Sequence, residues 1–185
     1  PVPLPLPPVI VTASRTPATR SANAVSALAW DRQRLSEPTF TIDEPLRRVP
    51  GVFIQNSFNF AQDQRIAIRG FGTRAAFGVR EIKVLVDGIP ESSPDGQTQL
   101  DNLDLGSARS IEVLRGPASA LYGNASGGVI HIRTEDGGEE PFVESRMSGG
   151  SYGFHKYQLK TGGRIKALDY HLNGSWSSID GYRRH

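Results

Sequence analysis

The segment from Ile111 to Thr134, IEVLRGPASALYGNASGGVIHIRT, most restricts the folds open to this chain of 185 residues. An apolar run at its start predicts a strand, which must end by Pro117 because proline cannot donate a ladder hydrogen bond. Pro117 also suits the first position of a short helix, and Gly123 can end that helix in a left-handed conformation. Gly127 and Gly128 allow a close backbone approach before a second apolar run. The segment therefore predicts a strand, a short helix and a second strand in close succession.

The residues before this segment alternate between short apolar runs and polar loops. A capping-box pattern, Thr41 with Glu44 three residues later, predicts a helix that ends at Pro50-Gly51. Apolar runs predict strands over residues 24–30, 52–54, 65–70 and 82–86. Polar loops lie between or after them, at residues 56–64, 71–80 and 91–99. Loops on a rigid scaffold carry recognition, so we expect these three to lie together at one end of a sheet.

The sequence pattern changes after Thr134. Residues 135–141 are charged and glycine-rich and read as a linker, and from residue 142 onward the periodicity is two. The alternation is cleanest from residue 168, where one set is Leu168, Tyr170, Leu172 and Trp176 and the other is Asp169, His171, Asn173 and Ser175. Such strands have one apolar and one polar face. They fit either a soluble meander with one wet face or a membrane barrel with its apolar face toward lipid.

Composition and motifs argue against several classes of function. The formal net charge is only +2 and no basic stripe carries interleaved aromatic residues, which argues against a nucleic-acid partner. The chain has no Cys, so it has neither a disulfide nor a thiolate metal site. Its four His lack the spacing of metal ligands, and no nucleophile–base motif occurs. We therefore expect no catalytic site, no metal site and no cofactor.

Several pieces of the chain, in order, resemble the plug domain of TonB-dependent outer-membrane transporters. In the opening segment they are I-E-V-L-R-G-P, S-A-L-Y-G, G-G-V-I and the closing I-x-T, and upstream they are L-x-x-V-P-G-V and V-L-V-D-G-I-P. The resemblance implies an α+β plug domain with a small mixed sheet, followed by antiparallel strands of an incomplete transmembrane β-barrel. The expected parts are an extended leader over residues 1–17, the plug over 18–134, the linker over 135–141 and the first barrel strands over 142–185. Because three strands cannot close a barrel, we expect the chain to be a fragment.

The resemblance also implies a function and its partners. The chain would belong to a non-enzymatic transporter in the outer membrane of a Gram-negative bacterium, with the lipid bilayer around its barrel. The expected ligand is an iron chelate, either a siderophore or ferric citrate, with haem, cobalamin or another metal chelate as alternatives. Val9, Ile10, Val11, Thr12 and Ala13 resemble a TonB box, an extended segment that can add a strand to TonB and so reach its inner-membrane energising complex. A soluble α+β ligand-binding module with a β-meander is the alternative reading.

Two arginines are candidates for holding the plug in its barrel. Arg69 and Arg115 lie in motifs whose arginines, in the family, pair with acidic residues on the inner barrel wall. A guanidinium suits such a role because it makes two parallel contacts with a carboxylate, which Lys cannot copy.

Four residues of the second and third loops are candidates for binding the ligand. Arg74 and Arg80 suit an anionic ligand. The third loop resembles the G-Q-x-Q loop of ferric dicitrate receptors, which carries a ligand-binding role over to Gln97 and Gln99. Amide donors together with Arg suit a citrate complex. The chain departs from that receptor at Lys83, where the receptor has Thr.

Overall fold

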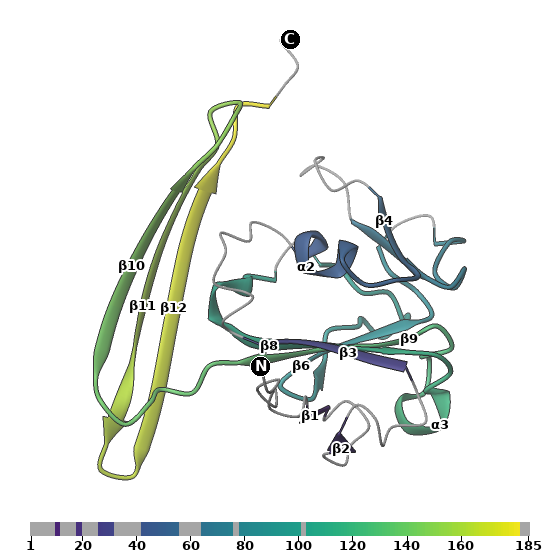
Figure 1. The fold of residues 1–185 in the computed structure, drawn as a ribbon, viewed down its shortest axis with the longest axis horizontal. Helices are drawn as coiled ribbons and strands as arrows, with labels where there is room; N and C mark the ends of the chain where they lie inside the picture. Colours follow the sequence, from purple (N-terminus) through teal and green to yellow (C-terminus); the bar gives the residue numbers. More distant parts are fainter. Residues whose placement is uncertain are drawn as a thin grey trace, which may run out of the picture. The chain divides into compact units, whose positions relative to one another are not determined.

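The computed structural model describes residues 10–11, 18–19, 26–31, 42–55, 64–75, 78–100 and 103–181. The chain divides into two compact units (Figure 1). Unit 1 comprises Pro1–Leu103 with Arg109–Arg133, and unit 2 comprises Asp104–Ala108 with Thr134–His185. The short segment Asp104–Ala108 thus belongs with the C-terminal part of the chain, although it lies between two stretches of unit 1.

A five-stranded mixed sheet, in the order β3-β8-β9-β6-β7, forms the centre of unit 1. Its strands are β3 (Ser26–Asp31), β6 (Ile82–Val86), β7 (Ile89–Pro90), β8 (Ala108–Arg115) and β9 (Gly128–Thr134). β3 pairs antiparallel with β8, whereas β6 pairs parallel with β9. The helix α3 (Ser119–Tyr122) connects β8 to β9. The strand–helix–strand unit and the small mixed sheet expected from the sequence are therefore confirmed.

A second layer and a small hairpin complete the described part of unit 1. The helix α2 (Asp43–Arg47) precedes an antiparallel hairpin of β4 (Val52–Gln55) and β5 (Arg65–Ile68). Figure 1 shows α2 and α3 on opposite sides of the five-stranded sheet. Near the N-terminus, β1 (Ile10–Val11) pairs antiparallel with β2 (Ala18–Thr19).

Apolar side chains cover both faces of the five-stranded sheet. Because side chains alternate along a strand, Val113 and Leu114 of β8 point to opposite faces, and both are buried. Leu114 packs with Leu85, Val129 and the residues around α3. Burying each of these aliphatic side chains contributes about 1.5–3 kcal/mol, so both helical layers are needed to hold the sheet.

Gly128 marks the close backbone approach predicted for the opening segment. Its φ is +145°, and a Cβ there would lie 2.3 Å from the carbonyl oxygen of Leu114. Only glycine fits, since β9 begins directly against the backbone of β8.

The helix expected after Thr41 differs from the prediction at both ends. Its N-cap is Ile42, with no side-chain cap hydrogen bond, and Thr41 lies outside the described residues. The helix ends at Arg47, before the stop expected at Pro50-Gly51. Between residues 100 and 110, the turn η1 (Leu105–Ser107) leads directly into β8.

Unit 2 is built on a three-stranded antiparallel sheet, here called the wall. Its strands are β10 (Phe142–Gly149), β11 (His155–Ile165) and β12 (Leu168–Ser178). The register places Glu144 beside Lys160 and Lys160 beside Asn173, so these side chains share one face. The alternation predicted from the sequence is confirmed on all three strands.

Some predictions concern residues that the structure does not describe. Among them are residues 1–9, in the expected leader, and residues 56–63, most of the first polar loop. Within the described ranges, none of the helices has the length and apolar character needed to cross a lipid bilayer.

Candidate functional site

The second and third loops of unit 1 are joined to each other. Val79 and Thr98 exchange both backbone hydrogen bonds, each 2.9 Å long. The Arg80 guanidinium lies 3.4 Å from the Asp95 carboxylate, which links the loops a second time. As expected from the sequence, these two loops therefore lie together, and we call residues 78–81 and 91–99 the loop pair.

Asp95 brings two of the four candidate ligand residues together. One of its oxygens accepts from Arg80, and the other accepts from the backbone N–H of Gln97 at 3.2 Å. Arg74 and Gln99 are exposed, Arg74 on the turn after β5 and Gln99 next to the buried Thr98. The backbone of Gln97 thus lies beside Asp95, the partner of Arg80, whereas Arg74 and Gln99 face solvent.

The ion pair between Arg80 and Asp95 contributes little to stability. The side chains of Arg80 and Asp95 are 49% and 55% exposed, and a pair in that setting contributes about 0–1 kcal/mol. An anionic ligand can therefore replace Asp95 as the partner of Arg80 at little cost. Lys83, which the sequence marked only as a departure from the dicitrate receptors, donates to Ser92 Oγ at 2.7 Å and ties β6 to the third loop.

Arg69 and Arg115 lie near each other at the end of unit 1 where β5 and β8 finish. Arg115 donates to the carbonyl oxygen of Pro50, and the backbone N–H of Arg69 donates to Gly51 at 2.9 Å. Burial, together with the charge of Arg69, lowers the pKa of Arg115. Two partly desolvated guanidinium groups thus lie near each other, which suits them to donate hydrogen bonds to a carboxylate.

The TonB-box candidate is described only at its centre. Ile10 and Val11 form β1, whose partner is Ala18–Thr19 of β2. Val9, Thr12 and Ala13 lie outside the described residues.

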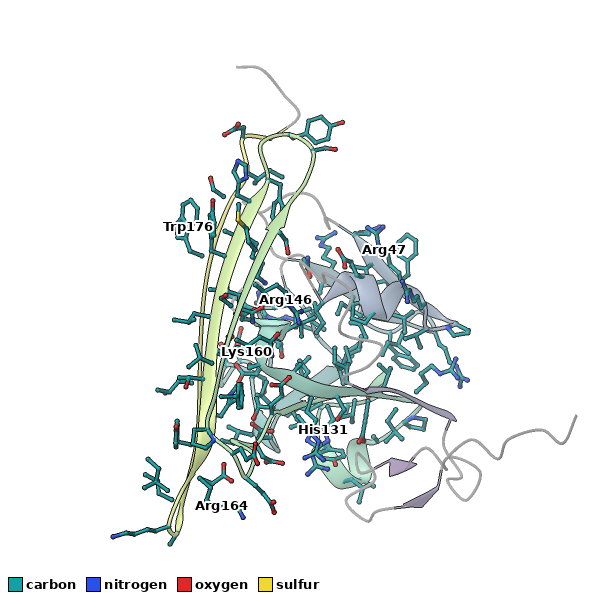
Figure 2. The ribbon with its side chains drawn as sticks, turned by 60° about the vertical axis from the view of Figure 1, so that its left-hand side comes forward. Arg47, His131, Arg146, Lys160, Arg164 and Trp176 are labelled. Atoms are coloured by element: carbon teal, nitrogen blue, oxygen red, sulfur yellow. The ribbon has the colours of Figure 1, made fainter. Side chains whose placement is uncertain are left out.

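The two faces of the wall differ in chemistry. Figure 2 shows Trp176 on one side of the wall, and Lys160 and Arg146 on the other. On the apolar face Val143, Met147, Leu159 and Leu172 are more than half exposed, and Tyr157 stacks on Trp176 with ring centroids 5.8 Å apart. An exposed apolar face of this kind suits lipid rather than water.

Asp104 docks on the polar face of the wall. Its carboxylate accepts from Asn173 at 2.9 Å and lies 3.2 Å from the ammonium of Lys156. It also accepts from the backbone N–H of Gly106 at 3.0 Å. Burial opposes the ionised form, but hydrogen bonds from Gly106, Ser175 and Asn173 and the charge of Lys156 outweigh it and lower the pKa of Asp104 to about 2.

A second acidic residue, Glu135, docks on the same face. Its two oxygens lie 3.3 and 3.2 Å from the ammonium of Lys160, and Glu144 lies 3.5 Å from the same ammonium. Arg146 contacts Glu144 at 2.9 Å, and His171 Nε2 lies 3.6 Å from Glu135. Lys160 and Glu135 are only 3% and 7% exposed, so this charge cluster is almost dry.

The segment read as a linker is packed on the wall. The backbone N–H of Glu135 donates to Ser107 at 2.9 Å, and that of Gly137 donates to Asp169 at 2.8 Å. A Cβ on Gly137 would lie 2.2 Å from the carbonyl oxygen of Tyr170. The glycine is therefore required by the close contact with β12 and not by flexibility.

Sequence reasoning missed the acidic residues of these two clusters. The alternation placed Lys156 and Lys160 on the polar face, but Asp104 fell in a predicted turn and Glu135 in the predicted linker. Two lysines on the polar face of one strand, β11, were the available signal, because a lysine that is buried needs an acidic partner. Among the described residues, no group of three or more His, Cys, Asp and Glu is placed to hold a metal ion.

Comparisons with known proteins identify relatives of this chain. The model of the TonB-dependent Receptor Plug Domain matches residues 17–129. The pesticin receptor of Yersinia pestis is 34% identical over 145 residues, which cover 76% of this chain and 21% of that receptor. This chain therefore spans about a fifth of the length of that curated relative.

Solved structures of outer-membrane receptors are also similar to this chain. The ferric yersiniabactin uptake receptor FyuA from Yersinia pestis is 30% identical, with a TM-score of 0.59 over 80% of this chain and 23% of that one. The pyoverdine outer membrane receptor FpvA from Pseudomonas aeruginosa PAO1 has a TM-score of 0.73 over 92% of this chain and 24% of that one, but at 19% identity this likeness shows only the fold.

These relatives are outer-membrane receptors of Gram-negative bacteria and not enzymes. The outer-membrane location and the absence of catalysis expected from the sequence are therefore supported by the family, and the reading as a soluble module is wrong. A closer relation to the ferric dicitrate receptors stays a prediction. With a family model matched over more than half of its length and a relative at 34% identity, the chain belongs to the TonB-dependent receptors and comprises their plug domain with the first strands of the barrel.

Proposed function

We propose that the protein imports a ferric siderophore across the outer membrane and that TonB energises the import. The observation that carries this proposal is the 34% and 30% identity to receptors whose names specify pesticin and ferric yersiniabactin. The plug blocks the pore of the full barrel at rest, and the wall contributes part of that barrel.

The loop pair supports an anionic, oxygen-rich chelate as the ligand. Arg80 lies beside Asp95, whose other oxygen accepts from the backbone N–H of Gln97. Arg74 adds a cation, and Gln97 and Gln99 add two side-chain amides, on the second and third loops. Carboxylate and phenolate oxygens of an iron chelate accept hydrogen bonds from both side-chain types. Ferric citrate stays a candidate because the G-Q-x-Q pattern of the third loop suits it.

Residues Val9–Ala13 are the proposed contact with TonB. An added strand binds mainly through its backbone, and the backbone of Ile10 and Val11 is paired with β2. TonB must therefore displace a ladder of only two residue pairs, which costs little.

Arg69 and Arg115 are the proposed contacts between plug and barrel wall. Their mutual repulsion, which helps to lower the pKa of Arg115, is relieved when a carboxylate on the inner surface of the full barrel lies between them.

Uptake of radiolabelled iron into cells that carry the full-length gene and lack other receptors tests the function. The chelates are ferric yersiniabactin, ferripyoverdine and ferric citrate, with haem and cobalamin as further probes. Uptake of one iron chelate that disappears when residues 9–13 are deleted is the expected result. Uptake that survives the deletion refutes the TonB-box assignment, and uptake of haem or cobalamin alone refutes the siderophore.

Variants of the loop pair test the ligand site. Arg80→Ala or Gln97→Ala is expected to weaken chelate binding by about tenfold, the usual effect of losing one hydrogen bond that involves a charged group. Arg133→Ala, at an exposed arginine on β9, is the matched control. Equal affinities for all three variants would place the ligand elsewhere.

A further inference from the structure

The two acidic clusters on the wall hold two separate pieces of the plug sequence. We call these pieces, residues 104–108 and 134–137, the docked segments. They flank residues 109–133, which form β8, α3 and β9 of unit 1. The hydrogen bond from the Glu135 N–H to Ser107 joins the docked segments to each other. The central pair of plug strands therefore leaves the wall and returns to it at one place.

The ion pair between Glu135 and Lys160 is buried, whereas the ion pair of the loop pair is exposed to water. Lys160 and Glu135 have side chains only 4% and 6% exposed, whereas Arg80 and Asp95 are about half exposed. Removing one partner of a buried ion pair costs much free energy, because the other charge then lacks its partner in a buried position. Removing one partner of an exposed pair costs little, because water solvates the other charge. The ion pair between the two loops of unit 1 is thus weak, whereas the ion pair that holds Glu135 on the wall within unit 2 is strong.

Packing adds to the ionic contacts. A Cβ on Gly106 would lie 1.5 Å from Gln158 Nε2, and the amide of Gln158 is held by Asn173 at 2.8 Å. Gly106 and Gly137 both lie directly against the wall, so each docked segment is in close contact with it.

We propose that Lys156 and Lys160 are positioning residues that keep the docked segments on the wall throughout transport, so that movement of the plug is confined to unit 1. The transport part of this inference rests on the proposed function. The docking part rests only on the two clusters, Asp104 with Lys156 and Glu135 with Lys160.

Gln158→Cys in the full-length receptor, with any other Cys replaced by Ser, reports on docking. Gln158 is 7% exposed and covered by Gly106, so its thiol reacts with a small hydrophilic maleimide only when the docked segments lift. In resting cells, adding Lys160→Met is expected to speed labelling by about tenfold or more, because buried Glu135 loses the ammonium that lies 3.3 and 3.2 Å from its two oxygens. Lys166→Met, at an exposed lysine of the β11–β12 turn, is the matched control and should leave the rate unchanged.

A second variant guards against misfolding. Glu135→Gln leaves Lys160 with Glu144 and is expected to speed labelling less than Lys160→Met does. Heat-modifiable gel mobility shows whether each variant has a folded barrel. Equal labelling rates in folded Lys160→Met, Glu135→Gln and the parent would overturn the docking role of these charges.

The transport arm compares energised cells with cells treated with a protonophore, both given ferric yersiniabactin. Labelling of Ala125→Cys, a fully buried reporter in unit 1, is expected to rise on energisation while labelling of Gln158→Cys stays the same. A parallel rise at both positions would overturn the confinement of movement to unit 1. If neither rises, the proposed function fails with this chelate, and the resting-cell arm still decides the docking.

Discussion

Asp104 should make the stability of the receptor depend on pH in acid. Its pKa falls from 3.8 to about 2 in the folded protein, and its side chain is 26% exposed. A group whose pKa is lowered by folding stabilises the fold above its unfolded pKa and loses that contribution as the pH falls through its folded pKa. The contribution of Asp104 is therefore present above about pH 4 and lost by about pH 2.

The size of this effect follows from the shift. At 1.36 kcal/mol per pKa unit, lowering the pKa from 3.8 to about 2 corresponds to about 2 kcal/mol. Asp104→Asn removes the charge while keeping the shape. We therefore expect this variant to be less stable than the parent by about 2 kcal/mol at about pH 5, and the two proteins to converge by about pH 2.

Guanidinium unfolding of the full-length receptor in detergent, repeated across this pH range, measures the difference. Other carboxylates titrate in both proteins, so only the gap between the two curves is informative. Asp95→Asn is the control, because its ion pair is water-exposed and contributes little at any pH. A gap between parent and Asp104→Asn that stays constant from about pH 5 to about pH 2 would refute the docking of a charged Asp104 on the wall.

Three other substitutions test separate parts of the structure by the same unfolding measurement. Gly128→Ala should cost about 2–4 kcal/mol, because its Cβ would lie 2.3 Å from the Leu114 carbonyl; a smaller cost than 1 kcal/mol would mean that the backbone relaxes. Both ring nitrogens of His131 are buried without a hydrogen-bond partner in the described part of the chain, and burial lowers the pKa of His131. The free energy of unfolding of the parent should therefore fall as the pH drops below 6.5, and His131→Leu should lack this contribution. Lys160→Met should cost about 3–5 kcal/mol, and adding Glu135→Gln should recover part of the loss; additive costs would contradict a direct pair.

The fold was predictable where local pattern and tertiary environment agree. In the segment 111–134, Pro117, Gly123 and Gly128 mark where strands and helix begin or end, so these elements could be placed from the sequence. The wall strands alternate strictly, so their two faces could be assigned. The N-cap of α2 was placed one residue early, at Thr41 and not at the buried Ile42, because a capping pattern carries no information about burial.

The candidate site was predictable only in part. The neighbourhood of Arg80 and Gln97 follows from two loops at one end of a sheet, but their shared contact with Asp95 depends on side-chain geometry that no periodicity contains. The docked segments could not be predicted in the same way. Asp104 lies 52 residues from Lys156 and Glu135 lies 25 residues from Lys160, and sequence spacing does not relate them.

The boundary between plug and wall is therefore not a point on the chain. A division at Thr134 assumes that each part is continuous, yet Asp104–Ala108 belongs with the wall and Arg109–Arg133 belongs with the plug. A chain that ended at Thr134 would retain Asp104 without Lys156 or Asn173, and so would lose a hydrogen bond and a charge that lower the pKa of this residue. The segments before β8 and after β9 therefore depend on residues that lie later in the sequence, because Asp104 pairs with Lys156 and Glu135 pairs with Lys160 on the wall.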